Sequence, residues 1–317
     1  MALYLVTGGA GFIGSHLAEE LLRRGQQVRI LDNFSTGKRE NIDPLRERLE
    51  LIEGDIRSYH TVRQAVHGVA YILHQGALPS VPRSINDPIT TNEVNVGGTL
   101  NLLDAARDAG VKRVVYASSS SVYGANTQVP KREDMTPQPI SPYAVSKLTG
   151  EHYCQVFSRT YGLETVSLRY FNVFGPRQDP QSAYSAFIPK FAAGLLRHQE
   201  LTIDGDGSQS RDFTFVRNVV EANLLAATTP GVGGEVFNIA CGTSLSVNEV
   251  AAHLAQLCGT AGRLVHGPSR AGDVPHSLAD ISRAKERLGY EPGVDARQGL
   301  AQVVQWFQEK FSREGRP

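Results

Sequence analysis

Tyr143 and Lys147 are four residues apart in the segment SPYAVSKLTGEHY, a spacing that supports acid–base chemistry. Residues at positions i and i+4 of a helix lie on one face, so we expect the phenol and the ammonium group side by side. A neighbouring cation favours the phenolate, and it would bring a proton transfer normally centred at a pKa of about 10 towards neutral pH. The pair therefore predicts that Tyr143 is a general base and acid beside a redox cofactor.

A glycine-rich turn near the start of the chain predicts that cofactor. Residues 3–6 form an apolar run typical of a buried strand, and apolar residues recur at helical spacing from Phe12 onwards. Between them the run GAGFIG, residues 9–14, fits the pattern G-x-G-x-x-G, and Gly8 adds a second fit as G-x-x-G-x-x-G. Such glycines let the backbone approach a pyrophosphate at the N-terminus of a helix. Asp32 ends the next predicted strand, where a carboxylate binds ribose hydroxyls and repels the 2′-phosphate of NADP. The order of these elements predicts an NAD site.

Composition limits the other classes of function. The chain has 317 residues, 41% of them hydrophobic, which is enough for one large core or two lobes. Its 32 basic and 32 acidic residues balance, so neither nucleic acid nor an anionic membrane is expected as a partner. Neither a signal peptide nor a run long enough to cross a bilayer is evident. Three scattered cysteines, Cys154, Cys241 and Cys258, are typical of reduced thiols in a cytoplasmic protein, and no histidine pair predicts a metal site.

Strands and helices alternate in the first half of the chain. We expect strands at 3–6, 28–31, 49–53, 69–74, 112–118 and 164–169, and helices at 12–22, 58–67, 92–109 and 143–161. This alternation predicts an α/β fold, a Rossmann-type doubly wound parallel sheet covered on both faces. After Phe171, Gly- and Pro-containing loops separate helices near 185–197, 216–229, 246–257 and 297–312. The predicted division is residues 1–170 for the NAD-binding domain and 171–317 for a smaller substrate-binding lobe, with some crossover of the chain between lobes.

Several longer motifs carry a resemblance to a known family. Four of them are TGGAGFIGSH, ASSSSVYG, SPYAVSK and RYFNVFGPRQ; more specific ones are DNFSTGKREN, HQGALPSVPRSINDP and RAGDVPHSLADISRAKERLGY. Over nearly its whole length the chain resembles the extended short-chain dehydrogenase/reductases, and among them the UDP-N-acetylglucosamine and UDP-glucose 4-epimerases. The resemblance implies bound NAD, a transient 4-keto sugar, and inversion at carbon 4 of a UDP-hexose. It also implies a homodimer, paired through helices around 92–109 and 143–161.

The resemblance assigns roles to individual residues. Tyr143 is implied as the base and acid, Ser119 as the hydrogen-bond partner of the reacting oxygen, and Lys147 as the residue that holds the nicotinamide ribose. The implied cofactor-binding residues are Gly8, Gly11, Phe12, Ile13, Gly14, Asp32, Asn33, Ser35, Thr36, Gly37, Asp55, Ile56, Gln75, Gly76, Ala77, Asn95, Tyr143, Lys147, Tyr170 and Val173. The implied substrate-binding residues are Ser80, Val81, Ser119, Ser120, Tyr143, Asn172, Ile188, Arg211, Arg270, Asp273 and Ser277.

The choice of substrate rests on a few positions. Related dehydratases carry an Asp-Glu pair where this chain has Ser120 and Ser121, so dehydration is not expected. Ser277 stands where enzymes restricted to UDP-glucose and UDP-galactose often have tyrosine, which predicts room for an N-acetyl group. UDP-GlcNAc/UDP-GalNAc is therefore the expected pair, with UDP-Glc/UDP-Gal also accepted. The alternative is an enzyme that epimerises or decarboxylates UDP-glucuronate. A catalytically silent nucleotide-binding protein is disfavoured, because Ser119, Tyr143 and Lys147 are all present.

Overall fold

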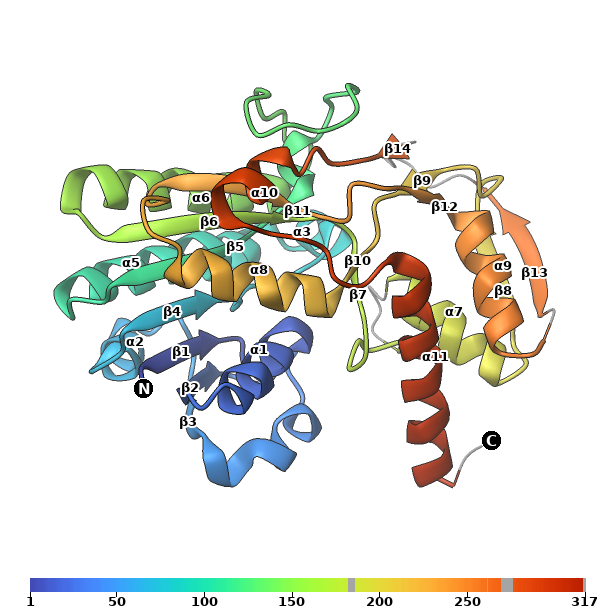
Figure 1. Ribbon diagram of the computed structural model, residues 1–317, viewed down its shortest axis with the longest axis horizontal. Coiled ribbons are helices and arrows are strands. Elements are labelled where there is room, and N and C mark those ends of the chain that lie inside the picture. Colours follow the sequence, from blue (N-terminus) through green and yellow to red (C-terminus); the bar gives the residue numbers. More distant parts are fainter. Residues whose placement is uncertain (182–185, 261, 269–275, 316–317) are drawn as a thin grey trace.

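A seven-stranded parallel sheet forms the centre of the larger part of the molecule (Figure 1). The computed structural model describes residues 1–181, 186–260, 262–268 and 276–315. The strand order is β11-β6-β5-β4-β1-β2-β3, which confirms the predicted Rossmann-type sheet. The strands are β1 (Leu3–Thr7), β2 (Gln27–Asp32), β3 (Glu50–Glu53), β4 (Tyr71–His74), β5 (Arg113–Ser119), β6 (Glu164–Tyr170) and β11 (Glu235–Ile239).

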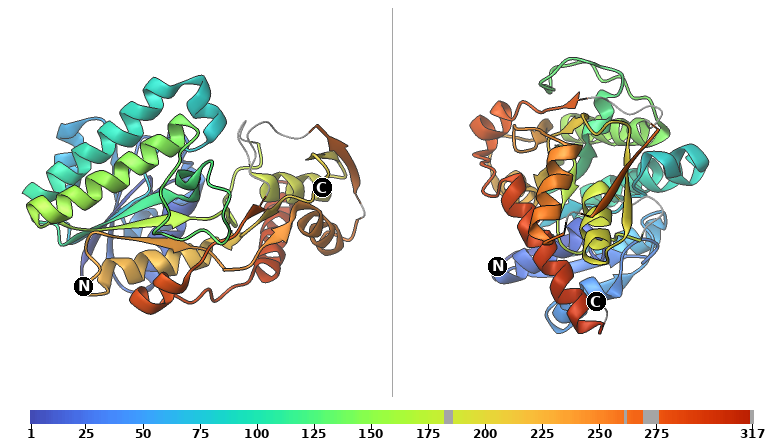
Figure 2. Two further views of the ribbon diagram at one scale, coloured as in Figure 1. Left: turned by 90° about the horizontal axis from the view of Figure 1, so that it is seen from above. Right: turned by 90° about the vertical axis from the view of Figure 1, so that its right-hand side faces the viewer.

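Helices cover both faces of this sheet, as apolar parallel strands require (Figure 2). On one face lie α2 (Tyr59–Val66), α5 (Gly98–Asp108) and α6 (Pro142–Tyr161), which pack together over a core that includes Leu102 and Phe157. On the other face lie α1 (Phe12–Arg23), α8 (Val216–Thr228) and α10 (Ser282–Leu288), over a core that includes Leu17 and Val219. The helix predicted at 92–109 is α4 (Pro88–Asn92), a π-helical turn (Glu93–Gly97) and α5 in succession, and α3 (Val81–Asn86) precedes them.

A smaller part of the molecule has its own hydrophobic core. Its helices are α7 (Phe187–Leu196), α9 (Val247–Leu257) and α11 (Ala296–Arg313), which surround a core containing Phe191 and Leu254. The parallel pair β8 (Glu200–Asp204) and β13 (Arg263–Gly267) packs beside α7. Short strands complete this part: β7 (Val173–Phe174) pairs with β10 (Thr214–Phe215), and β9 (Ser210–Arg211) lies between β12 (Leu245–Ser246) and β14 (His276–Ser277).

The chain crosses from the smaller part back to the sheet. After β10, α8 packs against the larger part, and β11 then pairs with β6 to form the edge of the sheet. α10 packs against β11 and α8 later in the chain. Sequence analysis identified α8 but neither β11 nor α10, because EVFNI is a short strand and SRAKERL is a short, charged helix. A division after residue 170 stays a prediction, and these three segments cross it.

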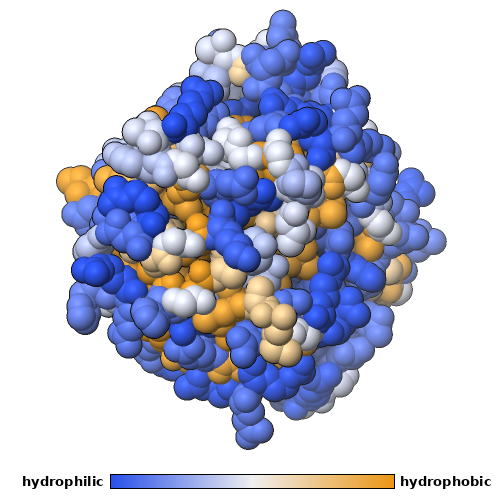
Figure 3. Space-filling model, turned by 60° about the vertical axis from the view of Figure 1, so that its left-hand side comes forward, coloured by the Kyte–Doolittle hydropathy of each residue, from blue (hydrophilic) through white to orange (hydrophobic). Residues whose placement is uncertain are grey.

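One face of the molecule is mostly hydrophilic (Figure 3). Figure 3 views the molecule from the side on which the strands of the sheet begin; hydrophobic residues show in the middle of this face and hydrophilic residues surround them. Within the described ranges, no helix is long and apolar enough to cross a membrane.

Candidate active site

A cavity of about 800 Å³ lies at the carboxyl ends of the sheet strands, where ligands bind in open α/β folds. It brings together most of the residues predicted to bind a cofactor. Those lining it are Gly8, Gly11, Phe12, Ile13, Gly14, Asp32, Asn33, Ser35, Thr36, Gly37, Asp55, Ile56, Gln75, Gly76, Ala77, Tyr143, Lys147 and Tyr170.

The glycine-rich turn connects β1 to α1 and has no space for side chains. Gly8 has a φ of +66°, and a Cβ atom there would lie 2.8 Å from the backbone nitrogen of Gly76. A Cβ on Gly14 would lie 2.1 Å from the carbonyl oxygen of Gly8. Gly11 is the N-cap residue of α1, so the helix N-terminus opens towards the cavity. The turn can therefore hold a pyrophosphate against backbone N–H groups, as NAD requires.

Asp32 at the end of β2 is oriented by two backbone groups. Its Oδ2 accepts a hydrogen bond from the Ala10 N–H (2.9 Å), and its Oδ1 accepts one from the Phe34 N–H (2.8 Å). Burial raises the pKa of this carboxyl group, and the two hydrogen bonds oppose that effect. Each oxygen keeps a lone pair for a ribose hydroxyl, so Asp32 fits the adenosine ribose of NAD.

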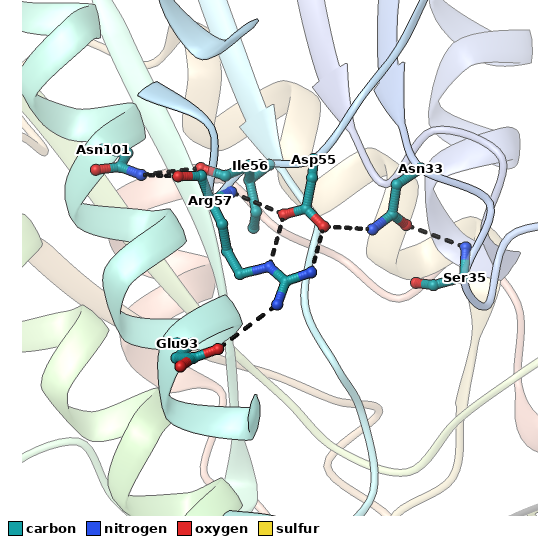
Figure 4. A network of polar contacts seen from close by, with 7 residues as sticks. All are labelled: Asn33, Ser35, Asp55, Ile56, Arg57, Glu93 and Asn101. Atoms are coloured by element: carbon teal, nitrogen blue, oxygen red, sulfur yellow. Dashed lines mark hydrogen bonds and ion pairs between the residues drawn. The ribbon is translucent and has the colours of Figure 1, made fainter. Parts of the chain in front are cut away.

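Arg57 organises the far end of the same cavity (Figure 4). Its Nε and Nη2 donate to the two carboxylate oxygens of Asp55 (3.1 and 2.9 Å), and Asn33 donates to the same carboxylate (2.8 Å). The hydrogen bonds from Arg57 lower the pKa of Asp55 to about 2. Asn101 of α5 donates to the carbonyl oxygens of Ile56 and Arg57 (3.1 and 3.0 Å). These contacts fix the loop after β3 beside the loop after β2.

Ser119, Tyr143 and Lys147 meet where β5 ends and α6 begins. Ser141 caps α6 by accepting a hydrogen bond from the Ala144 N–H (3.2 Å), which places Tyr143 in the first turn. Ser119 lies close enough to Tyr143 to lower the pKa of its phenol. Lys147 donates from Nζ to the carbonyl oxygen of Ala117 (2.8 Å), and burial lowers the pKa of its ammonium group to about 8.

One expectation about this group is wrong. Burial raises the pKa of Tyr143, and its hydrogen bond to Ser119 lowers the pKa by less. Lys147 does not bring the pKa down as predicted, because its Nζ turns to β5 and lies 5.9 Å from the centre of the Tyr143 ring. In the protein alone, Tyr143 therefore favours its protonated form.

Two predicted cofactor residues, Asn95 and Val173, do not line the cavity. Asn95 is 1% exposed; its Oδ1 accepts from the Leu78 N–H (2.7 Å), and its Nδ2 donates to the Leu78 carbonyl (3.1 Å) and to Ser146 Oγ (3.0 Å). It thus holds the loop after β4 against α6. Val173 lies in β7, which pairs with β10.

The predicted substrate residues fall into two groups. Ser80 lines the cavity with a φ of +96° and caps α3, whose first residue is Val81. Ser120 begins the 3-10 turn (Ser120–Tyr123) after β5. Ile188 is 2% exposed and packs in the core of the smaller part, so its expected contact with substrate is not evident.

The other group lies in the smaller part of the molecule. Arg211 of β9 is directly opposite Ser277 of β14. Their role in substrate binding stays a prediction. Asn172 donates to the carbonyl oxygen of Asp212 (3.1 Å), which joins this group to the end of β6. Arg270 and Asp273 lie outside the described residues.

The loop after β7 contributes residues to the lining of the cavity. This contribution was not predicted from the sequence. We call residues 176–181 the strap. Lys38 Nζ and Asp179 Oδ2 are 2.9 Å apart, and both residues line the cavity. Arg177 pairs with Glu19 of α1 (2.5 Å). The only signal was the quoted motif RYFNVFGPRQ, which ends at residue 178. The unpredicted lining residues are Leu31, Phe34, Lys38, Gly54, Arg57, Leu78, Pro79, Arg83, Thr90, Val94, Ala117, Ser118, Gln178, Asp179 and Ala186.

Comparison with known proteins identifies the family. The model of the NAD dependent epimerase/dehydratase family matches residues 4–240. The chain belongs to this family. Among the described residues, no group of three or more His, Cys, Asp or Glu could hold a metal ion. The cavity, its glycine turn and Asp32 fit the NAD on which the epimerase/dehydratase family depends.

Relatives within the family differ in the sugar named. A UDP-glucose 4-epimerase of Mycolicibacterium smegmatis is 39% identical over 310 residues, covering 96% of this chain and 98% of that protein. A UDP-N-acetyl-alpha-D-glucosaminuronate decarboxylase of Bacillus cytotoxicus is 36% identical over 316 residues, covering 96% and 97%. The structure of a UDP-N-acetylglucosamine 4-epimerase from Methanobrevibacter ruminantium has a TM-score of 0.93 and 38% identity, and covers 98% of this chain and 99% of that one.

Proposed function

We propose that the protein is a UDP-sugar 4-epimerase that acts on UDP-GlcNAc/UDP-GalNAc, and also on UDP-Glc/UDP-Gal. The observation that carries the proposal is that Tyr143 and Lys147 line a cavity that fits NAD, with Ser119 beside Tyr143 at the end of β5. These residues supply a proton acceptor and a hydroxyl to orient the sugar oxygen. Membership of the epimerase/dehydratase family supports the reaction class.

The proposed chemistry balances without any external oxidant. Tyr143 accepts the proton of the sugar 4-hydroxyl while the hydride at carbon 4 leaves, which makes a 4-keto sugar. When bound, NAD+ would supply the acceptor for that hydride and the donor for its return to the opposite face of carbon 4. Tyr143 then gives its proton back to the oxygen. Lys147 holds the nicotinamide ribose, and Ser119 hydrogen-bonds the reacting oxygen.

Dehydration is disfavoured by what lies beside the acid–base group. Ser120 and Ser121 occupy the turn after β5, and no carboxylate acid stands in those two positions. The carboxylates that line the cavity, Asp32, Asp55 and Asp179, belong to the turns after β2 and β3 and to the strap. The keto intermediate is therefore expected to be reduced again rather than to lose water.

Ser277 supports the N-acetylated substrates. It lies opposite Arg211 in the small sheet, and a serine leaves room beside a guanidinium that can bind phosphate oxygens. We propose that Arg211 contacts the UDP diphosphate and that Ser277 borders carbon 2 of the sugar. A uronate substrate is the alternative, since the relative from Bacillus cytotoxicus is named for a uronate sugar.

The outer face of α6 supports assembly as a homodimer. Val145 and Val156 are 50% and 49% exposed, and they lie three helical turns apart on one side of the helix. We propose that this face pairs with the same face of a second chain and that the dimer acts in the cytoplasm. Light scattering should give the mass of two chains.

One chromatographic assay tests the activity and the choice of sugar. Purified protein is incubated separately with UDP-Glc, UDP-GlcNAc, UDP-GlcA and UDP-GlcNAcA, without added NAD. The expected result is conversion of UDP-GlcNAc to UDP-GalNAc, slower conversion of UDP-Glc, and no release of CO₂. Conversion of the uronates alone would support the alternative, and no conversion of any sugar would contradict an epimerase.

A further inference from the structure

Glu151 is a buried carboxylate on the same face of α6 as Tyr143 and Lys147. It follows Lys147 by four residues, as Lys147 follows Tyr143, so the three side chains lie along one stripe of the helix. Glu151 is 1% exposed and Lys147 is 4% exposed. None of the proposed chemical steps uses Glu151, although a carboxylate is costly to bury. Its partners indicate why it is there.

Arg169 of β6 and Ser118 of β5 hydrogen-bond this carboxylate. Glu151 Oε1 accepts from Nε of Arg169 (2.9 Å), and its Oε2 accepts from Nη2 (2.8 Å). The Ser118 hydroxyl also donates to Oε1. Such a bidentate pair is strong, and removing one partner would leave a buried charge without compensation. Glu151 therefore forms a buried ion pair with Arg169.

Two successive residues at the end of β5 are hydrogen-bonded by side chains of α6. Lys147 donates to the carbonyl oxygen of Ala117 (2.8 Å), and Glu151 accepts from the hydroxyl of the next residue, Ser118. Ala117 and Ser118 line the cofactor cavity. The residue after them is Ser119, the partner of the proposed acid–base group. Glu151 thus fixes the backbone from which Ser119 projects.

The surroundings of Lys147 contain one carboxylate. The titratable and charged groups facing it are Tyr143, Glu151 and Cys154 of α6, His74 of β4, Tyr116 of β5 and Arg169 of β6. Thr99 Oγ1 donates to the Asn95 carbonyl (2.6 Å), so it accepts from His74 Nε2 (3.0 Å), and His74 Nδ1 accepts from Thr7 (2.6 Å). His74 is therefore neutral, and Glu151 is the only carboxylate among these groups.

We propose that Glu151 is a positioning residue of the reaction, which keeps Lys147 cationic and fixes Ser119 at the end of β5. The inference rests on the proposed function, in which Lys147 holds a ribose and Ser119 orients the sugar. Burial lowers the pKa of Lys147 to about 8, and Glu151 opposes that lowering. The thiol of Cys154 is neutral at that pH, because burial raises its pKa to about 12. Lys147 is thus a cation below about pH 8, and without Glu151 the cation is lost at lower pH.

The first test is the pH profile of kcat and KM for Glu151→Gln. We expect the alkaline limb of kcat to move down by about one pH unit or more, with a smaller change in KM. Glu151→Asp keeps the charge and should restore the wild-type profile at a lower kcat. An unchanged profile in Glu151→Gln would overturn the proposal.

Glu164→Gln is the matched control at the other end of the same two strands. Glu164 of β6 pairs with Arg113 of β5 (2.6 Å), and the Arg113 side chain is 5% exposed. This variant should lose stability without any shift of the pH profile. If Glu151→Gln does not fold, Ser118→Ala tests the positional part: kcat should fall while the profile stays in place, and a wild-type kcat would contradict that part.

The second test needs no activity. Isotope-labelled lysine in the NAD-bound protein reports the Lys147 ammonium by NMR, with Lys147→Arg used for assignment. The Lys147 titration should move to lower pH in Glu151→Gln and stay in place in Glu164→Gln. Identical titrations in all three proteins would overturn the inference. If Glu151→Gln shifts the Lys147 titration but the wild-type protein epimerises no sugar, only the proposed function would be contradicted.

Discussion

At Tyr143 two physical effects oppose each other. Burial favours the neutral phenol, whereas the hydrogen bond to Ser119 favours the phenolate, and burial is the larger effect. A positive charge beside the phenol would add to the effect that favours the phenolate and lower its pKa further, which would help Tyr143 to accept a proton. The phenol oxygen is therefore the atom whose removal should matter most.

Tyr143→Phe removes this oxygen and leaves the ring. We expect kcat to fall by about 10² or more, because a general acid–base group is lost, while bound NAD is retained. Tyr116→Phe is the matched control, since Tyr116 is also buried but its hydroxyl faces the backbone of α6, 3.4 Å from the Lys147 carbonyl. Chromatographic turnover and acid extraction of NAD measure both effects. Normal turnover by Tyr143→Phe would contradict the mechanism.

Ser277→Tyr should separate the two pairs of substrates. A tyrosine beside Arg211 fills the space assigned to the N-acetyl group, and overpacking of a well-packed site costs about 1–3 kcal/mol. UDP-GlcNAc turnover should be lost while UDP-Glc turnover survives. Ser277→Ala keeps the space and should accept both. Equal losses on the two substrates in Ser277→Tyr would show that this position does not select the sugar.

Site residues were predictable where a local pattern fixes them. Gly8, Gly14 and Asp32 line the cavity because the strand–turn–helix–strand order puts them at the carboxyl ends of β1 and β2. Tertiary contacts decide the rest. Lys147 turns to a β5 carbonyl that its i+4 spacing from Tyr143 does not reveal, and Asn95 supports a loop instead of lining the cavity.

At the level of elements, α6 packs closely against β5 at Gly150. A Cβ on Gly150 would lie 2.2 Å from the hydroxyl oxygen of Tyr116. Gly150 is therefore needed for the close approach that lets Lys147 and Glu151 reach Ala117 and Ser118.

Gly150→Ala should consequently destabilise the protein despite the better helix propensity of alanine. We expect a loss of about 1–3 kcal/mol in the free energy of unfolding, as for other overpacked sites. Thermal denaturation followed by circular dichroism measures it. Gly97→Ala is the control, because a Cβ on Gly97 meets nothing within 4 Å. Similar melting temperatures for both variants would show that the interface adapts to the extra methyl group.

Helices and strands with a long hydrophobic pattern were predicted more accurately than short ones. The buried strands β1, β2, β5 and β6 are apolar runs, and they lie within two residues of their predicted bounds. The π-helical turn Glu93–Gly97 interrupts a single predicted helix, because the sequence pattern alone does not indicate a local change of hydrogen bonding. β11 is short, and pairing with β6 defines it as a strand.

At the scale of the whole molecule, the strap joins the two parts across the cofactor cavity. Lys38 follows β2 and Asp179 follows β7, and their ion pair joins these two segments in the lining of the cavity. His16 of α1 also hydrogen-bonds the Pro176 carbonyl (3.0 Å). These contacts would restrain release of NAD between half-reactions.

Asp179→Asn should therefore release NAD faster. Both side chains of the Lys38–Asp179 pair are partly exposed, so we expect an increase in the dissociation rate of about two- to fivefold, greatest at low salt. Dilution into a competing dehydrogenase that consumes NAD gives the rate. Asp134→Asn is the control, because Asp134 pairs with Arg132 on the surface and does not line the cavity. An unchanged rate would mean that other contacts retain the cofactor.

Because the chain returns to the sheet after residue 170, the sheet cannot be completed early in synthesis on the ribosome. When residues 1–170 have been made, β6 still lacks its neighbour β11, and the face later covered by α8 and α10 is bare. Unpaired edges and exposed apolar faces are the features that make nascent chains aggregate. The larger part cannot be completed until residue 239 and then residue 288 have been synthesised. Its folding is therefore tied to synthesis of most of the smaller part, although the cofactor-binding turn lies within the first fourteen residues.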